Sequence, residues 1–139
     1  SIKTVIDSVG STRGFTWGTN GGTPIAALNV GNGNMQIAGS FTAVGNVTAY
    51  SDERLKTDIQ TLDGKKVLQM RGVSFTKDGA VSSGVIAQEL EKIAPELVHD
   101  GEYKSVAYGN LVGYLIENAK AQQKEIDELK SLVKQLLEK

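Results

Sequence analysis

The stretch from Ser51 to Lys56, Ser-Asp-Glu-Arg-Leu-Lys, gathers a hydroxyl, two carboxylates and two cations within a few positions. A serine hydroxyl becomes a nucleophile when a nearby base takes its proton. The chain has no Cys and His99 is its only His, so a lysine is a candidate for that base. A lysine that acts as a base must be neutral, which requires its pKa to fall from about 10.4 through burial or through a nearby cation such as Arg54. A nucleophile–base pair of Ser51 and Lys56 is therefore one interpretation of this stretch.

A structural interpretation accounts for the same residues. Ser51 or Asp52 can cap the N-terminus of a helix, and acidic residues in the first turn are favoured by the helix dipole. Because Ser and Lys five positions apart are common, spacing alone favours the cap. The residues by themselves leave both interpretations open.

The composition of the chain changes abruptly at this stretch. Residues 1–50 carry only Lys3, Asp7 and Arg13, whereas residues 51–139 carry the other 28 charged residues. Nine of the 16 glycines lie in the first part. We therefore place a boundary at 50/51, between a first part of residues 1–50 and a second part of residues 51–139.

The first part has the pattern of short strands with small side chains. From Met35 to Ala49 the odd positions are mostly apolar or small and the even positions mostly polar, which indicates half-buried strands. Gly31-Asn32-Gly33-Asn34 predicts a turn rather than a phosphate loop, because no helical pattern follows it. So few small side chains bury little apolar surface, which favours three copies wrapped together as the distal end of a β-structured trimeric fibre shaft. An ordinary small β-domain is the alternative.

The middle of the chain predicts a compact α+β unit. Helical patterns cover 67–70 and 85–93, the second ended by Pro95. Strand patterns cover 73–76, 96–98 and 105–108, and Asp78-Gly79 and Asp100-Gly101 are turn signals.

The last part of the chain, residues 111–138, predicts one long helix with a heptad repeat. Leu132 and Leu137 widen its apolar face, which suits more than two helices, and the polar Gln122 would fix the register. The alternative is a single amphipathic helix packed on its own domain. The seam positions are Val112, Ala119, Ile126 and Val133 at a, and Leu115, Gln122, Leu129 and Leu136 at d.

Composition argues against several classes of protein. The net charge of −1 offers no basic patch for nucleic acid or an anionic membrane, and no apolar run approaches 18 residues. No signal peptide is visible, and the absence of Cys rules out disulfides and Cys-based zinc sites. We expect no cofactor and no metal. Because the chain starts with Ser rather than Met, we expect it to be part of a longer one.

Three stretches in order resemble one known family. They are YSDERLKTDI from Tyr50, GVIAQELEKIAPELV from Gly84 and YKSVAYGNLVGYLIENAK from Tyr103, followed by the heptad helix. Together they resemble the intramolecular chaperone and auto-processing domain, of the endosialidase type, at the C-terminus of phage tail fibres and tailspikes. The resemblance covers residues 50–139.

The resemblance implies a homotrimer that folds the shaft preceding it and then hydrolyses the Tyr50–Ser51 bond. It assigns Ser51 and Lys56 to a catalytic Ser-Lys dyad, with Asp52 and Arg54 as supporting residues, and Gln88, Glu89 and Asn110 as mainly structural ones. It implies a tail fibre or spike precursor assembled in the host cytoplasm, whose chaperone part is absent from the mature virion and whose partners are its own copies and its own shaft. The alternative function is a non-catalytic trimerisation knob or receptor-binding tip that stays attached.

Overall fold

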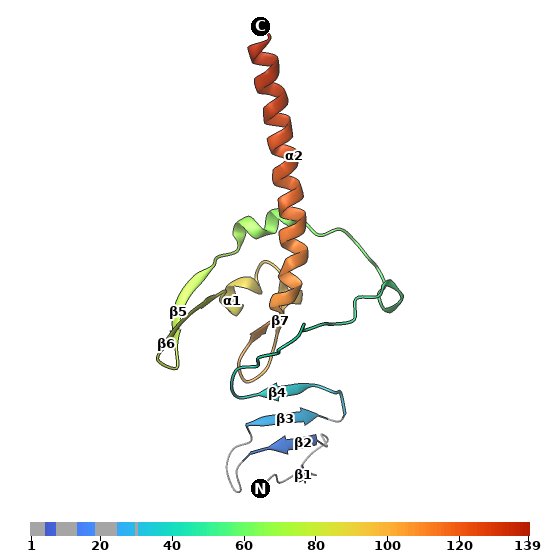
Figure 1. Ribbon diagram of the computed structural model, residues 1–139, viewed down its shortest axis with the longest axis vertical. Coiled ribbons are helices and arrows are strands. Elements are labelled where there is room, and N and C mark those ends of the chain that lie inside the picture. Colours follow the sequence, from blue (N-terminus) through green and yellow to red (C-terminus); the bar gives the residue numbers. More distant parts are fainter. Residues whose placement is uncertain (1–4, 8–13, 19–24, 30) are drawn as a thin grey trace. The chain divides into compact units, whose positions relative to one another are not determined.

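The computed structural model describes residues 5–7, 14–18, 25–29 and 31–139 (Figure 1). The chain divides into two compact units, Ser1–Asp52 and Glu53–Lys139. Strands and helices both occur, which confirms the predicted α+β class. The division between units lies two residues after the predicted junction at 50/51. The change in composition places the junction at 50/51 and the resemblance places the cleavage there; both stay predictions.

The first unit contains a four-stranded antiparallel sheet in the order β1-β2-β3-β4. The predicted turn at Gly31–Asn34 is confirmed and joins β3 to β4. Gly33 has a φ of 74°, and its N–H donates to the Asn29 carbonyl at 2.7 Å. Glycine adopts this left-handed backbone without steric cost. The strands are β1 (Val5–Asp7), β2 (Gly14–Trp17), β3 (Ala26–Asn29) and β4 (Met35–Ile37).

The predicted strands over residues 35–49 are wrong beyond Ile37. Between β4 and residue 53 the chain forms no strand or helix, and every residue from 38 to 52 is exposed. A strand requires a hydrogen-bonded neighbour, and among the residues that the structure describes no strand pairs with this segment. The alternation of residue types therefore did not predict the local structure here.

The second unit contains a two-stranded hairpin of β5 (Val73–Lys77) and β6 (Ala80–Gly84). The predicted turn at Asp78-Gly79 is confirmed, and both residues have positive φ, 52° and 78°. Two such residues in a two-residue loop match the right-handed twist of the flanking strands. A second small ladder pairs β7 (Val98–His99) with β8 (Ser105–Val106).

Several predicted helices and strands have different bounds. The helix over 85–93 is only α1 (Ala87–Leu90), and Glu96 and Leu97 belong to the 3-10 helix η3 (Pro95–Leu97) rather than to a strand. Proline favours the first position of a helical turn, so Pro95 begins η3 after ending the preceding helical segment. The helix at 67–70 is the longer 3-10 helix η2 (Gly64–Gln69), capped by the Asp63 side chain.

The predicted long helix is confirmed as α2 (Leu111–Leu137), preceded by the 3-10 helix η4 (Tyr108–Asn110). Its first turns cover a small core. Among the described residues, the buried hydrophobic side chains of this core are Leu90, Ala94, Leu97 and Tyr114.

In the second unit, η2 and α2 approach each other closely. The Asn118 side-chain amide donates to the Gly64 carbonyl oxygen at 3.1 Å, and both residues are buried. A Cβ atom on Gly64 would lie 2.3 Å from the Asn118 backbone nitrogen. Gly64 is therefore required because it lets the two backbones touch.

A buried hydroxyl joins the same helix to η3. The Tyr114 hydroxyl donates to the Glu96 carboxylate, which raises the pKa of Tyr114 to about 12 and lowers the pKa of Glu96. In both cases the hydrogen bond itself is the main cause. The bond favours the neutral phenol together with the ionised carboxylate.

We expect Gly64→Ala to destabilise the second unit by about 3 kcal/mol, because the added methyl group collides with the backbone of α2. Gly72→Ala is the matched control, since a Cβ there meets nothing within 4 Å. Urea unfolding followed by circular dichroism, at one chain concentration, measures both free energies. Equal effects of the two substitutions would contradict the close contact.

We expect Tyr114→Phe to lower the free energy of unfolding by about 1 kcal/mol at pH 7. Because the pKa of Glu96 is depressed in the folded state, this contribution is present above the ordinary carboxyl pKa and is lost as the pH falls through the folded value. Because the pKa of Tyr114 is raised, the contribution is also lost as the pH rises from about 10. Urea unfolding of both proteins between pH 3 and pH 11 checks this, and a constant difference would contradict it.

Candidate functional site

The residues at the predicted cleavage bond lie in an exposed part of the first unit. Tyr50 is 95% exposed, and Ser51 and Asp52 are exposed as well. None of these three residues belongs to a helix or a strand. The peptide bond between Tyr50 and Ser51 is therefore accessible in the single chain.

The second unit begins with the short 3-10 helix η1 (Glu53–Leu55). The Lys56 N–H donates to the Glu53 carbonyl at 3.0 Å and closes this turn. The side chains of Arg54 and Lys56 are exposed. Ser51 and Asp52 thus belong to one unit and Arg54 and Lys56 to the other, so the pairing of Ser51 with Lys56 stays a prediction.

Other polar groups of the second unit have structural partners. Glu89, expected to be structural, receives two hydrogen bonds from the Arg71 guanidinium, which lowers the pKa of Glu89 and raises that of Arg71. Lys104 contacts Glu91 and Asp100, and these contacts raise its pKa. These ion pairs connect neighbouring elements and are exposed or only partly buried.

No group of three His, Asp or Glu side chains among the described residues is placed to hold a metal ion. None of the helices described has the length and apolar character needed to cross a bilayer.

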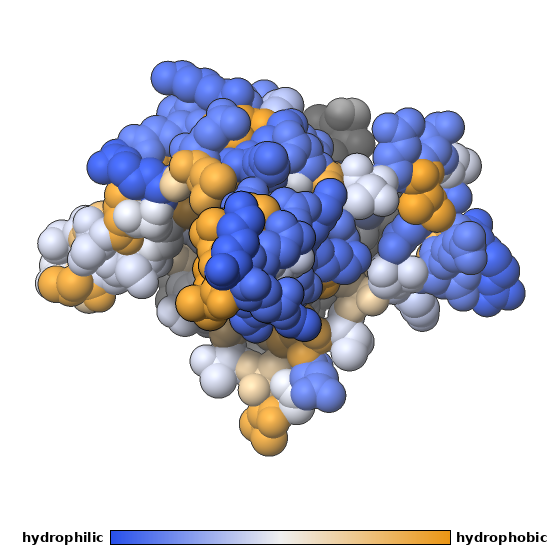
Figure 2. Space-filling view, turned by 90° about the horizontal axis from the view of Figure 1, so that it is seen from above, coloured by the Kyte–Doolittle hydropathy of each residue, from blue (hydrophilic) through white to orange (hydrophobic). Residues whose placement is uncertain are grey.

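A second candidate site is the apolar face of α2. The predicted heptad positions lie on this helix with their side chains exposed, for example Leu129 at 61%. Seen from above, apolar side chains gather along one side of the central column of atoms and hydrophilic ones cover the other (Figure 2). We call this face the α2 seam; it consists of Val112, Leu115, Ala119, Ile126, Leu129, Val133 and Leu136.

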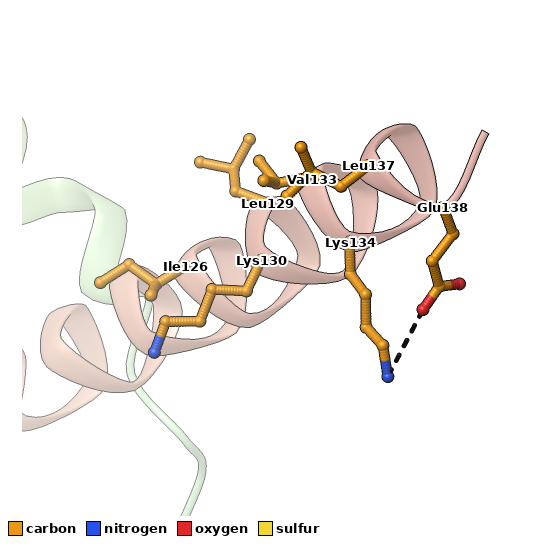
Figure 3. Close-up of a pocket in the computed structure, with 7 residues that line it drawn as sticks. All are labelled: Ile126, Leu129, Lys130, Val133, Lys134, Leu137 and Glu138. Atoms are coloured by element: carbon orange, nitrogen blue, oxygen red, sulfur yellow. Dashed lines mark ion pairs between the residues drawn. The ribbon is translucent and has the colours of Figure 1, made fainter.

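The C-terminal turns of the α2 seam form a shallow groove (Figure 3). Apolar side chains make up its floor, and Lys130 and Lys134 lie along one edge, with Lys134 paired to Glu138 at 4.0 Å. Its apolar residues are Ile126, Leu129, Val133 and Leu137. Apolar surface lined by lysine side chains on one edge fits the packing of another amphipathic helix.

Sequence reasoning located the α2 seam but missed the contact that holds α2 to its own unit. Asn118 is the one buried polar residue among those described, and it binds Gly64, 54 positions earlier. A polar residue beside an apolar stripe was a visible signal, but no pattern in a single sequence connects it to a particular glycine.

Comparison with known proteins gives two matches. Residues 51–99 match the model of a peptidase family described as "Chaperone of endosialidase". The chain is also 32% identical, over 125 aligned residues, to the long tail fiber protein Gp37 of Salmonella phage S16. Both matches confirm the resemblance stated from the sequence.

The extent of these matches differs. The alignment with the fibre protein covers 76% of this chain but only 16% of that protein, so the chain spans a small part of its relative. The family match begins at Ser51, the residue after the predicted cleavage bond.

Proposed function

We propose that this chain, which carries the segment related to the chaperone of endosialidase, is the C-terminal assembly part of a phage tail fibre or tailspike. Three copies associate, residues 51–139 assist the folding of the preceding shaft, and the chaperone part then releases itself by cutting Tyr50–Ser51. The precursor would be assembled in the host cytoplasm, and the chaperone part would leave before the virion matures. The observation that carries this proposal is the family match that begins at Ser51.

Exposed surface supports association of several copies. The α2 seam holds large apolar side chains that are more than half exposed, such as Leu129 at 61% and Leu136 at 67%, and such surface is favourably removed from water. Identical chains meeting along identical seams remove it without any further partner.

The polar residues beside the α2 seam favour parallel helices in register. Glu125 occupies a g position and Lys130 the e position five residues later. In a parallel coiled coil these two positions face each other between neighbouring helices, so the charges attract. The next such pair, Leu132 and Leu137, is apolar and widens the shared core.

Assembly also gives the chaperone role a physical basis. Strand pairing between three chains is non-local and slow, because chain ends must first be brought together. A locally folding helix that trimerises raises the effective concentration of the three shafts and sets their alignment. After cleavage the shaft is left trimeric without the segment that assembled it.

The proposed reaction is an acyl shift followed by hydrolysis. The Ser51 hydroxyl oxygen attacks the Tyr50 carbonyl carbon while Lys56 accepts the hydroxyl proton. The Tyr50–Ser51 C–N bond breaks, the Ser51 nitrogen takes up a proton as the new amine, and an ester joins Tyr50 to the Ser51 oxygen. Water then hydrolyses the ester to a Tyr50 carboxylate and the free hydroxyl. Asp52 and Arg54 support the site.

Lys56 explains why assembly and cleavage belong together in this proposal. Its side chain is exposed in the single chain. Packing of other copies around the segment would bury it, and burial is what favours the neutral form of a lysine in general. The same exposure fits the alternative function, a trimerisation or receptor-binding tip that never cuts.

We expect Ser51→Ala and Lys56→Ala to abolish cleavage and leave one intact chain. Ser40→Ala and Lys65→Ala are matched controls, because both residues are exposed and lie outside the reactive stretch. Intact mass spectrometry of freshly produced protein distinguishes two fragments that meet at 50/51 from one chain. Fragments in the Ser51→Ala protein would refute the dyad, and an intact wild-type chain would favour the attached tip.

We expect Leu129→Asp to weaken trimer association by at least about 100-fold, since it places a carboxylate at a position that the proposed trimer buries in every copy. Ser131→Asp on the hydrophilic face of α2 is the control and should leave the trimer intact. Sedimentation equilibrium over a range of concentrations measures both. A single-chain mass for the wild-type protein would overturn the trimer itself.

A further inference from the structure

The segment before the proposed cleavage bond repeats every three residues. From Phe41 it reads Phe-Thr-Ala, Val-Gly-Asn, Val-Thr-Ala and Tyr-Ser-Asp, so that each large apolar residue is followed by two small or polar ones. We call the large apolar residues the triplet row; they are Phe41, Val44, Val47 and Tyr50.

The triplet row has no cover within the described part of the chain. Phe41 is 68% exposed, Val47 78%, and Val44 is fully exposed. A Cβ built on Gly39 or Gly45 meets no atom within 4 Å, so open space surrounds the backbone here. Large apolar side chains in such a regular arrangement are normally buried against a partner.

The spacing of the triplet row indicates how it is buried. In a strand, side chains three positions apart point to opposite faces of the sheet. In an extended chain with three residues per turn, they share one side. The triplet row therefore forms a continuous apolar edge only in the second geometry, which agrees with the absence of a strand between Ile37 and Glu53.

We propose that the triplet row packs against the triplet rows of two further copies of this chain around a common axis, in four layers that end at Tyr50. Tyr50 in the last layer is then a positioning residue, which holds the adjoining Tyr50–Ser51 bond in place for cleavage. This inference rests on the proposed trimer and extends it to residues that a single chain leaves without a strand.

The composition of the segment favours a copy of itself as the partner. No charged residue occurs between Arg13 and Asp52, so nothing repels an identical segment and nothing complements a charged one. The residues between the row positions are small or short, which permits close approach of three backbones. The row's own apolar side chains, from Phe41 at 68% to Tyr50 at 95% exposed, are the surface that such a partner would cover.

The position of Tyr50 connects assembly to chemistry. An attack on a carbonyl carbon is fast only when the reacting atoms are held close and aligned. In the single chain the bond after Tyr50 lies outside any helix or strand. Once the Tyr50 ring is packed in the last layer, the carbonyl that Ser51 attacks has a fixed direction, so completion of the row precedes cleavage.

Cysteine crosslinking tests the packing, because the chain contains no native Cys. Val44→Cys and, as the matched off-row control, Thr42→Cys are each combined with Ser51→Ala, and trimer mass is confirmed by sedimentation. Mild oxidation and a non-reducing denaturing gel then report disulfides, which form only between closely placed cysteines. We expect Val44→Cys to form disulfide-linked dimers. One disulfide joins two of the three chains in a trimer, so at most two thirds of the chains become linked. We expect Thr42→Cys to remain unlinked.

The other outcomes are equally informative. Equal linking at both positions in an intact trimer would indicate a strand, in which these residues share a face, and would overturn the triplet row while leaving the proposed function standing. No linking at either position in an intact trimer would place the row against another part of the chain or a different partner, and would also overturn it. Loss of the trimer would overturn both proposals.

Substitution of Tyr50 tests its positioning role in the otherwise wild-type chain. We expect Tyr50→Ala to slow cleavage about tenfold or more without changing the trimer mass, and Tyr50→Phe to restore the rate, because the ring and not the hydroxyl fills the layer. The rate is followed by intact mass against time. An unchanged rate in Tyr50→Ala trimers would refute the role, and so would a Tyr50→Phe protein as slow as Tyr50→Ala.

Discussion

Shortage of internal core is the constraint on which the rest of this molecule depends. In the described residues the second unit buries four hydrophobic side chains well. The α2 seam and the segment 38–50 leave most of their apolar side chains exposed to water. A fold with so little burial has a small margin over the conformational entropy that it must overcome. The proposed association of copies would add the burial that the single chain lacks.

The contacts that the single chain does make are concentrated at the base of α2. Gly64 lets η2 lie directly on the backbone of α2, and the Asn118 side chain donates to the Gly64 carbonyl. The Tyr114 hydroxyl donates to the Glu96 carboxylate of η3. These are polar and steric contacts that require defined geometry. They fix the orientation of the helix on its unit, while the apolar seam of the same helix is left exposed.

Much of the second unit was predictable from local patterns. The hairpin at Asp78-Gly79 and the helix from Leu111 follow from turn residues and from a heptad repeat, which act within a few positions. The strand prediction over 38–49 was wrong because this segment of small residues fits both a two-residue and a three-residue repeat. Only the absence of a neighbouring strand in the described structure distinguishes the two patterns. The boundary at 50/51 followed from the change in composition, whereas the catalytic assignment of Ser51 and Lys56 came from resemblance, because the residues alone fit a helix cap equally. Their pairing stays a prediction.

Because Tyr114 and Asn118 hold α2 to the rest of the second unit, any rotation of the helix about its axis also rotates that unit. Each residue of an α-helix turns it by about 100° and advances it by about 1.5 Å. A slip of one residue along the seam would swing the attached unit through more than a quarter of a circle, whereas a slip of a full heptad restores its angle to within about 20°. Alternative registers of the proposed coiled coil would therefore differ by whole heptads. Gln122, the single polar residue in the d positions, would give these registers different free energies.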